Sequence, residues 1–241
     1  MSDFDSAAYR LIIRVGLPII RLVTKWEWRG VAHVPATGPC IIVPNHTSYW
    51  DPLAVGHFLI DGCRRRPRYL GKREIVEMPV LGKFFQAAGQ IPVHRNTTNA
   101  VNAYKDAIAA LEQGHCIALY PEGTTTQDPD NWPMMGKTGA ARLALTTGAP
   151  VIPVAQWGAE QVIPNQDKFE LHLFPRKTMQ VRAGEPVNLD DLRDQPMTAE
   201  LLAEATDRIM LAITLLLAEI RGEQPPAERY NPRQRRGGAS A

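Results

Sequence analysis

Cys40-Ile41-Ile42-Val43-Pro44-Asn45-His46-Thr47-Ser48-Tyr49-Trp50-Asp51-Pro52 is the stretch from which the fold can be predicted. Its first four residues have the apolar, β-branched character of a buried strand, and the turn residues Thr37-Gly38-Pro39 precede them. The apolar run then stops, and Asp51-Pro52 is typical of a helix N-cap followed by the first helical position. The stretch therefore predicts a strand, a turn and a helix, with polar side chains at the carboxyl end of the strand, where α/β sheets usually place their functional residues.

His46 and Asp51 are five positions apart in this turn. On a continuous helix they would point roughly 140° apart and could hardly pair. Pro52 disfavours helical dihedrals at Asp51, so a turn can fold the two side chains together. A carboxylate on one ring nitrogen would fix the imidazole tautomer, and the other nitrogen could then act as a general base. From these residues alone an alternative stays open: Asp51 only caps the helix, and His46 only satisfies a loop backbone group.

Strand and helix patterns alternate along the rest of the chain. Apolar, β-rich runs predict strands at residues 116–120, 151–154, 170–174 and 178–183. Apolar residues at helical spacing predict helices at residues 79–88, 99–113, 138–147 and 199–221. The alternation predicts an α/β fold with a mostly parallel central sheet flanked by helices. A chain of 241 residues is long enough for one large domain, which we predict at residues 29–221.

Residues 1–28 predict an N-terminal amphipathic helical segment that docks on a membrane. Its cations fall within roughly 60° of one another on a helical wheel and apolar residues cover the rest; they are Arg10, Arg14, Arg21 and Lys25. The longest uncharged run, 15–20, is far shorter than the roughly 20 residues that a spanning helix needs. The pattern therefore favours a helix lying on an anionic membrane surface, although a core-packing helix with a solvated basic face would have the same pattern.

Composition and motifs exclude several classes of protein. Net charge is only +2, and a short basic cluster at 64–73 without a recognisable binding module argues against nucleic acid as a partner. Three widely separated cysteines are typical of a reduced, cytosolic protein, and the histidines lack metal-ligand spacing, so no metal site is predicted. Gly136-Lys137-Thr138 lacks the upstream glycine of a P-loop. Residues 222–241, rich in arginine and proline, predict a disordered basic tail.

Four motifs, in order, resemble the lysophosphatidate acyltransferase family of glycerolipid synthesis. Residues 45–51 resemble its H-x4-D motif, and residues 89–95 its G-x-I-x-V-x-R block. Tyr120-Pro121-Glu122-Gly123-Thr124 is similar to the F-P-E-G-T block, and Ile152-Pro153-Val154 to the last proline-containing strand. Lys72 and Lys137 also lie where the family usually has lysines.

The resemblance implies an enzyme that transfers a fatty acyl group from acyl-CoA or acyl carrier protein to the free hydroxyl of lysophosphatidic acid. His46 would be the general base and Asp51 its orienting carboxylate. The implied acceptor-binding residues are Lys72, Arg95, Glu122, Gly123, Thr124 and Lys137. The thioester is a co-substrate, so no cofactor is expected, and no nucleophile is framed for an acyl-enzyme.

Two alternative functions remain open, one with another acceptor and one without catalysis. The family usually has an arginine where this chain has Thr125, so a glycolipid or another lysophospholipid remains a possible acceptor for the same chemistry. A membrane-docked lipid-binding protein without turnover is the alternative from another class. In either case the basic, amphipathic N-terminus predicts a peripheral protein at the cytoplasmic face of the cell membrane.

Overall fold

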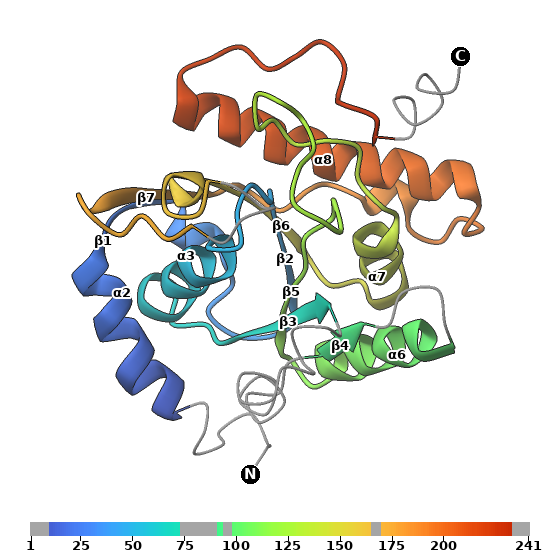
Figure 1. Cartoon of the computed structure of the whole chain (residues 1–241). Helices are drawn as coiled ribbons and strands as arrows, with labels where there is room; N and C mark the ends of the chain where they lie inside the picture. Colours follow the sequence, from blue (N-terminus) through green and yellow to red (C-terminus); the bar gives the residue numbers. More distant parts are fainter. Residues whose placement is uncertain (1–9, 73–90, 94–97, 165–169, 233–241) are drawn as a thin grey trace.

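A computed structural model describes residues 10–72, 91–93, 98–164 and 170–232 (Figure 1). Within them, seven strands form a sheet in the order β1-β7-β6-β2-β5-β3-β4. In chain order the strands are β1 (Thr24–Arg29), β2 (Cys40–Pro44), β3 (Pro67–Lys72), β4 (Ile91–Val93), β5 (Cys116–Ala118), β6 (Val151–Trp157) and β7 (Lys177–Ala183). From β6 to β4 all neighbours are parallel, whereas β7 is antiparallel to β6 and parallel to β1. The predicted α/β fold with a mostly parallel sheet is confirmed.

Helices cover both faces of this sheet (Figure 1). One face packs against α6 (Thr98–Glu112), α7 (Gly139–Thr147) and α8 (Ala199–Arg221). The other packs against α3 (Asp51–His57), which continues into the π-helical turn η4 (Phe58–Gly62). Short 3-10 turns are η3 (Val31–His33), η5 (Ala159–Gln161) and η6 (Asp190–Leu192).

Strand β2 lies at the centre of both packing layers. Ile41 and Val43 pack among residues of α6 to α8, whereas Cys40 and Ile42 pack on the side of α3 and η4. Every residue of β2 is buried, which is why the strand is an uninterrupted apolar run instead of an alternating one. The polar residues that follow β2 are therefore held by a fully buried strand in the middle of the sheet.

The N-terminal segment is helical only as far as Val23. A π-helical turn, η2 (Ile12–Gly16), leads into α2 (Leu17–Val23). The predicted helix through residue 28 is wrong beyond that point, because β1 begins at Thr24 and pairs with β7. Threonine and tryptophan at alternating positions favour a strand over a helix. The sheet thus begins before the predicted domain boundary at residue 29, and residues 1–9 lie outside the described part.

Other predictions need correction or fall outside the description. Residues 170–174 form no strand; their backbone contact is the N–H of His172 with the carbonyl of Val162. The tail is ordered as far as Pro232, because Tyr230 accepts the N–H of Met135 and Arg229 pairs with α8, so the prediction of disorder is wrong for 222–232. The predicted helix at 79–88 and residues 233–241 lie outside the described residues.

Candidate active site

Asn45 lies where the chain leaves the sheet. Its side-chain amide continues the pairing of β2 with β6, because Oδ1 accepts the backbone N–H of Gln156 (2.8 Å) and Nδ2 donates to the carbonyl of Gln156 (3.1 Å). Asn45 is buried, so its side chain takes the place of a backbone group after the main chain has turned away. This fixes the direction in which His46 leaves the sheet.

His46 and Asp51 meet across the turn. His46 Nδ1 lies 2.7 Å from Asp51 Oδ2, and the same oxygen accepts the backbone N–H groups of Thr47 (2.6 Å) and Ser48 (2.9 Å). The Asp51 side chain is fully buried, whereas the His46 side chain is 14% exposed. The contact assigns the ring proton to Nδ1 and leaves Nε2 as an acceptor. The predicted pairing is present, and its catalytic role stays a prediction.

Asp51 does not cap α3. It is the first residue of the helix, and its carboxylate turns back toward the amides that precede the helix. Ser48 Oγ accepts the N–H of Trp50, the residue directly before the helix (3.1 Å). The predicted N-cap role is therefore wrong, because the carboxylate instead binds the imidazole of His46 and two backbone amides of the loop. The start of α3 orients Asp51 toward His46.

Behind Asp51 lies a buried polar chain that sequence patterns did not reveal. Gln156 Nε2 donates to Thr47 Oγ1 (3.0 Å), and this hydroxyl lies 3.4 Å from Asp51 Oδ1. All three side chains are buried. Among the described residues Gln156 Oε1 has no hydrogen-bond partner, so the amide's contribution is made through its nitrogen. A single glutamine in the otherwise apolar strand β6 is the sequence signal that could have indicated this contact.

Glu122 holds the backbone of His46 from the opposite side. Its Oε1 accepts the N–H of His46 (2.9 Å), and its Oε2 accepts the N–H of Met134 (3.1 Å). Four residues later, the N–H of Thr126 donates to the carbonyl of His46 (2.6 Å). Both backbone groups of His46 are thus bound by the loop that follows β5.

The burial of Glu122 changes how its predicted role can be understood. Only 1% of the residue is exposed, and this burial raises the pKa of Glu122 to about 8, although the amides of Met134 and His46 act in the opposite direction. Both carboxyl oxygens face backbone amides, so direct contact with an acceptor is not what this geometry favours. Glu122 instead positions His46, and any effect on substrate would be indirect.

Tyr120 packs against the imidazole. The two ring centroids are 4.1 Å apart with an angle of 27° between the planes, and Tyr69 stacks beyond Tyr120 at 6.4 Å. The Tyr120 hydroxyl is buried with no hydrogen-bond partner among the described residues, and burial raises the pKa of this hydroxyl well above its ordinary value. The ring of Tyr120 is therefore the part that restrains His46, as a phenylalanine would.

Gly123 and Lys137 lie together beside the Glu122 loop. Gly123 has φ +73°, and a Cβ there would meet Lys137 Nζ at 2.8 Å, so a side chain would be both strained and crowded. The backbone N–H of Lys137 donates to the carbonyl of Pro121 (2.8 Å), and Lys137 is exposed. Thr124, half-buried, follows in the same turn. The structure thus brings three of the predicted acceptor-binding residues into one loop region.

The other predicted cations are not placed. Lys72 is the last residue of β3, but its side chain and the whole of Arg95 lie outside the described residues. Thr125, at the position of the family's usual arginine, is buried. In the described ranges no group of three or more His, Cys, Asp or Glu side chains could hold a metal ion, and the three cysteines are free and buried.

The chain is similar to known acyltransferases. The acyltransferase family model matches residues 25–157, more than half of the chain. The chain is 27% identical over 142 residues to the chloroplastic 1-acyl-sn-glycerol-3-phosphate acyltransferase of Brassica napus, a match that covers 58% of this chain and 39% of that protein. It is 26% identical over 177 residues to the 1-acyl-sn-glycerol-3-phosphate acyltransferase of Bacillus subtilis, a match that covers 73% of this chain and 80% of that protein.

A solved structure shows the same fold. The crystal structure of the 1-acyl-sn-glycerophosphate acyltransferase PlsC from Thermotoga maritima matches with a TM-score of 0.68 and 21% identity, over 90% of this chain and 81% of that one. The chain belongs to the acyltransferase family. The resemblance to lysophosphatidate acyltransferases is confirmed, and the matched range contains both loops that hold His46.

Proposed function

We propose that this protein transfers a fatty acyl group from a thioester, carried by coenzyme A or acyl carrier protein, to the free hydroxyl of lysophosphatidic acid. The product would be phosphatidic acid. The observation that carries the proposal is the pairing of a partly exposed His46 with a fully buried Asp51 at 2.7 Å, in a chain of the acyltransferase family. This arrangement supports a general base whose tautomer is fixed and whose second nitrogen, Nε2, can accept a proton.

The reaction needs one proton carrier and no covalent enzyme intermediate. His46 Nε2 takes the proton of the acceptor hydroxyl as the oxygen attacks the thioester carbon. The ester C–O bond forms, the C–S bond breaks, and the imidazolium returns the proton to the leaving thiolate. Asp51 stabilises the imidazolium during this step, and a positioned base of this kind contributes on the order of 10² to 10⁴ in rate.

Acceptor recognition would use Lys137, beside the loop that follows β5, together with two cations that lie outside the described side chains. Lys137, which lies beside Gly123 near Glu122, would neutralise the phosphate monoester together with Lys72 and Arg95. Thr124 would lie at the edge of the same site. Because Thr125 replaces the family's usual arginine, a glycolipid or another lysophospholipid is the alternative acceptor that the same assay has to include.

The apolar surface of α2 supports docking on a membrane. Leu17, Ile20 and Val23 are buried against the domain, as in a core-packing helix. A second apolar stripe nevertheless remains exposed on the same helical segment, at Leu11, Val15, Ile19 and Leu22. In the described part of the chain no helix is long and apolar enough to cross a membrane. An exposed apolar stripe beside cations suits a peripheral helix on anionic lipid.

Only part of the predicted cationic set is available for lipid. Arg21 forms an ion pair with Asp61 at 2.6 Å, whereas Arg14 and Lys25 are exposed beside the stripe. We expect Arg14 and Lys25 to face headgroups at the cytoplasmic face of the cell membrane, the location we propose.

Purified protein with a panel of acceptors tests the proposal. Lysophosphatidic acid, a lysophosphatidylcholine, a glycolipid and an uncharged monoacylglycerol are each supplied with acyl-CoA or acylated carrier protein. Thiol release and the product mass are then measured. Phosphatidic acid formed fastest would support the proposal. Faster acylation of another acceptor would replace the substrate but keep the chemistry, and absence of thiol release with every pair would favour a lipid-binding protein.

A further inference from the structure

The two most exposed large apolar side chains of the described residues lie at one corner of the molecule. Phe174 is 72% exposed and Leu22 is 70% exposed, whereas the next in order, Val101, is 54% exposed. Single exposed apolar residues are common on soluble proteins and need no explanation. Two apolar residues that are both this exposed, at the same corner, do need an explanation.

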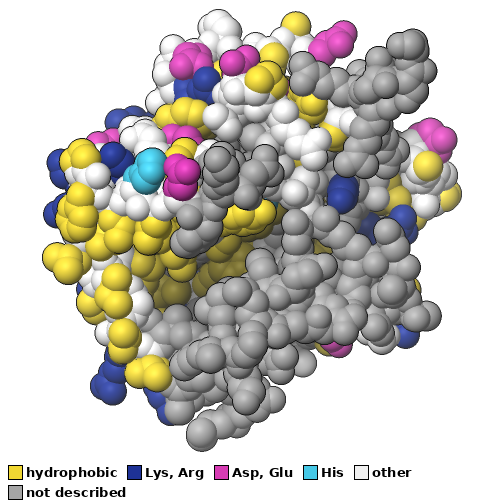
Figure 2. Space-filling model, viewed as in Figure 1, with side chains coloured by type: hydrophobic (Ala, Val, Ile, Leu, Met, Phe, Trp, Pro, Cys, Tyr) yellow, Lys and Arg dark blue, Asp and Glu magenta, His cyan; other side chains and the backbone are white. Residues whose placement is uncertain are grey.

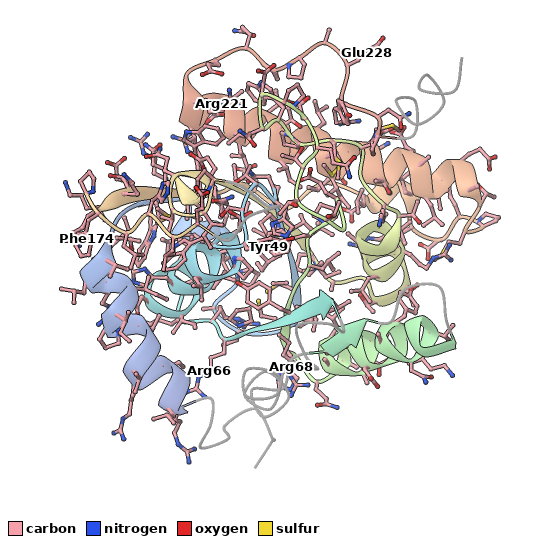
Figure 3. All side chains as sticks on the ribbon, viewed as in Figure 1. Tyr49, Arg66, Arg68, Phe174, Arg221 and Glu228 are labelled. Atoms are coloured by element: carbon pink, nitrogen blue, oxygen red, sulfur yellow. The ribbon has the colours of Figure 1, made fainter. Side chains whose placement is uncertain are left out.

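Arg176 ties the segment that carries Phe174 to the end of α2. Its Nη2 donates to the carbonyls of Arg21 (2.8 Å) and Thr24 (2.5 Å), the last turn of α2 and the first residue of β1. Strand pairing continues from this point, with Lys177 opposite Thr24. Figure 3 shows Phe174 beside the β1 end of α2. These contacts hold the segment that carries Phe174 at the end of α2 that carries Leu22.

Neighbouring side chains in the segment point in different directions. Leu173 packs with the cluster around Ala54 and Met179 on the side of α3, so the segment is anchored in the core at the residue directly before Phe174. Phe174 has no such burial. A large aromatic side chain held outward by an anchored backbone is a feature expected of a surface that contacts something apolar.

Charge indicates what that apolar partner is. Lys25 is exposed and Lys177 is partly exposed at the start of the paired strands β1 and β7, close to the two apolar tips. Figure 2 shows hydrophobic side chains gathered over α2 and α3 on this face, with Lys and Arg at their margin. Glu27 and Glu170 are also exposed in these segments. The residues that directly flank the two tips, Lys25, Arg176 and Lys177, are nevertheless cationic. Apolar tips that can enter acyl chains, with cations beside them at headgroup level, fit an anionic bilayer better than a second protein.

We infer that Phe174 and Leu22 form a single bilayer-inserting corner, so that the segment 170–176 is a second membrane contact beside the N-terminal helix. The inference rests on the membrane docking proposed above and extends it to a part of the chain about 150 residues later, as the contact between Arg176 and Thr24 shows. The partner is the anionic lipid surface itself.

Vesicle binding by the full chain tests this directly. Phe174→Ser and Leu22→Ser are compared with wild type by co-sedimentation with phosphatidylcholine vesicles that contain phosphatidylglycerol. Leu211→Ser, which changes an apolar residue of similar exposure on α8 (53%), is the matched control. We expect each corner variant to weaken the partition coefficient roughly tenfold or more, the effect of withdrawing one large side chain from an apolar phase, and the control to bind as wild type does.

A second measurement locates the side chain. Phe174→Cys is labelled with an environment-sensitive fluorophore, which is practical because the three native cysteines are buried. A blue shift on adding vesicles, absent from the same label at Leu211→Cys, is expected. Thermal melts of all variants show whether each remains folded.

The outcomes separate this inference from the proposals on which it rests. If wild type binds vesicles and Phe174→Ser binds equally well, the inserting corner is wrong while docking by α2 stands. If wild type binds no vesicles, both membrane docking and the inserting corner are wrong. The proposed acyl transfer is then still tested by the thiol-release assay with dispersed acceptors. If Phe174→Ser abolishes a dimer without changing vesicle binding, the corner is a contact between copies of this chain.

Discussion

Gln156 donates a hydrogen bond of 3.0 Å to Thr47, although the two residues lie 109 positions apart in the chain. The contact joins β6 to the turn that carries His46, and through the Thr47 hydroxyl it reaches Asp51. Because all of these side chains are buried, the position of the carboxylate depends on groups that no substrate would touch. Asp51 thus orients His46 directly, and Thr47 and Gln156 orient Asp51 from behind.

The first prediction follows from this chain of contacts. Thr47→Val and Gln156→Met keep the side-chain volumes but remove the hydrogen bond. A buried hydrogen bond contributes on the order of 1–2 kcal/mol, so we expect kcat to fall about 5- to 30-fold with little change in KM. Steady-state kinetics measure both values, and Thr47→Ser, which keeps the hydroxyl, should restore most of kcat.

A control and a double variant make this prediction specific. Thr214→Val removes another buried hydroxyl, one that donates to the carbonyl of Met210 within α8, and should leave kcat unchanged. The variant that combines Thr47→Val and Gln156→Met should lose no more than the worse single variant. Independent, multiplying losses would show that Gln156 does not act through Thr47.

The second prediction concerns the dyad. His46→Ala should abolish thiol release with an unchanged thermal melt, because a loop side chain that is partly exposed leaves the core intact. Asp51→Asn should retain weak activity, since the imidazole remains but loses its carboxylate. His172→Ala, at a histidine whose side chain is 51% exposed, is the matched control. Wild-type turnover by His46→Ala would rule out the proposed base.

The third prediction is a pH dependence of stability. Burial raises the pKa of Glu122 to about 8 from an ordinary value of 4.5. The folded protein then keeps a proton that the unfolded chain has released, so the free energy of unfolding contributed by Glu122 falls as pH rises from about 4.5 through about 8. In Glu122→Gln this contribution is absent. The wild type should therefore lose stability relative to the variant over that window, by up to about 5 kcal/mol.

Urea unfolding of both proteins at several pH values measures this difference. His57 and His115 have pKa values lowered by burial, which gives a dependence of the opposite sign, but both histidines are present in each protein and cancel in the comparison. A difference that is constant between pH 5 and 8 would mean that Glu122 is ionised throughout, with its two backbone amides as its partners.

The fourth prediction concerns the acceptor. Lys137→Ala should raise KM for lysophosphatidic acid about 10- to 100-fold, the effect of losing a charge-assisted contact of about 1.5–3 kcal/mol. KM for an uncharged monoacylglycerol should not change. Lys105→Ala, an exposed lysine on α6, provides the comparison. Equal losses with both acceptors would show that Lys137 does not recognise phosphate.

The fifth prediction concerns two exposed cations of the N-terminal segment, Arg14 in η2 and Lys25 in β1. Arg14→Glu combined with Lys25→Glu should weaken binding to anionic vesicles steeply at low salt, because each cation near such a surface contributes about 1 kcal/mol and the reversal adds repulsion. The difference should shrink as salt is raised. Lys105→Glu should have little effect, and unchanged co-sedimentation of the double variant would argue against docking through this face.

Much of the fold could be predicted because its signals are local. The apolar run of β2 and the helical spacing of α8, predicted at 199–221, are each contained in a short window of sequence. Strand β1 is not predicted, because Trp26 and Trp28 also fit the end of the preceding amphipathic pattern, although their alternation indicates a strand. The order of residues 222–232 could not be predicted, because it depends on contacts such as the ion pair between Arg229 and Asp207, which joins the tail to α8.

The sequence by itself determined that His46 and Asp51 could pair, because only the four residues of a local turn separate them. Only the tertiary structure decided which groups hold the pair in place. Gln156 and Glu122 reach the turn from β6 and from the loop after β5, and their buried polar groups acquire partners only when the sheet has formed. The same is true of the segments that carry Phe174 and Leu22, which the pairing of β1 with β7 brings together. A pattern in sequence records which face of an element is apolar, but which faces meet and which stay exposed is fixed by packing between elements far apart in the chain.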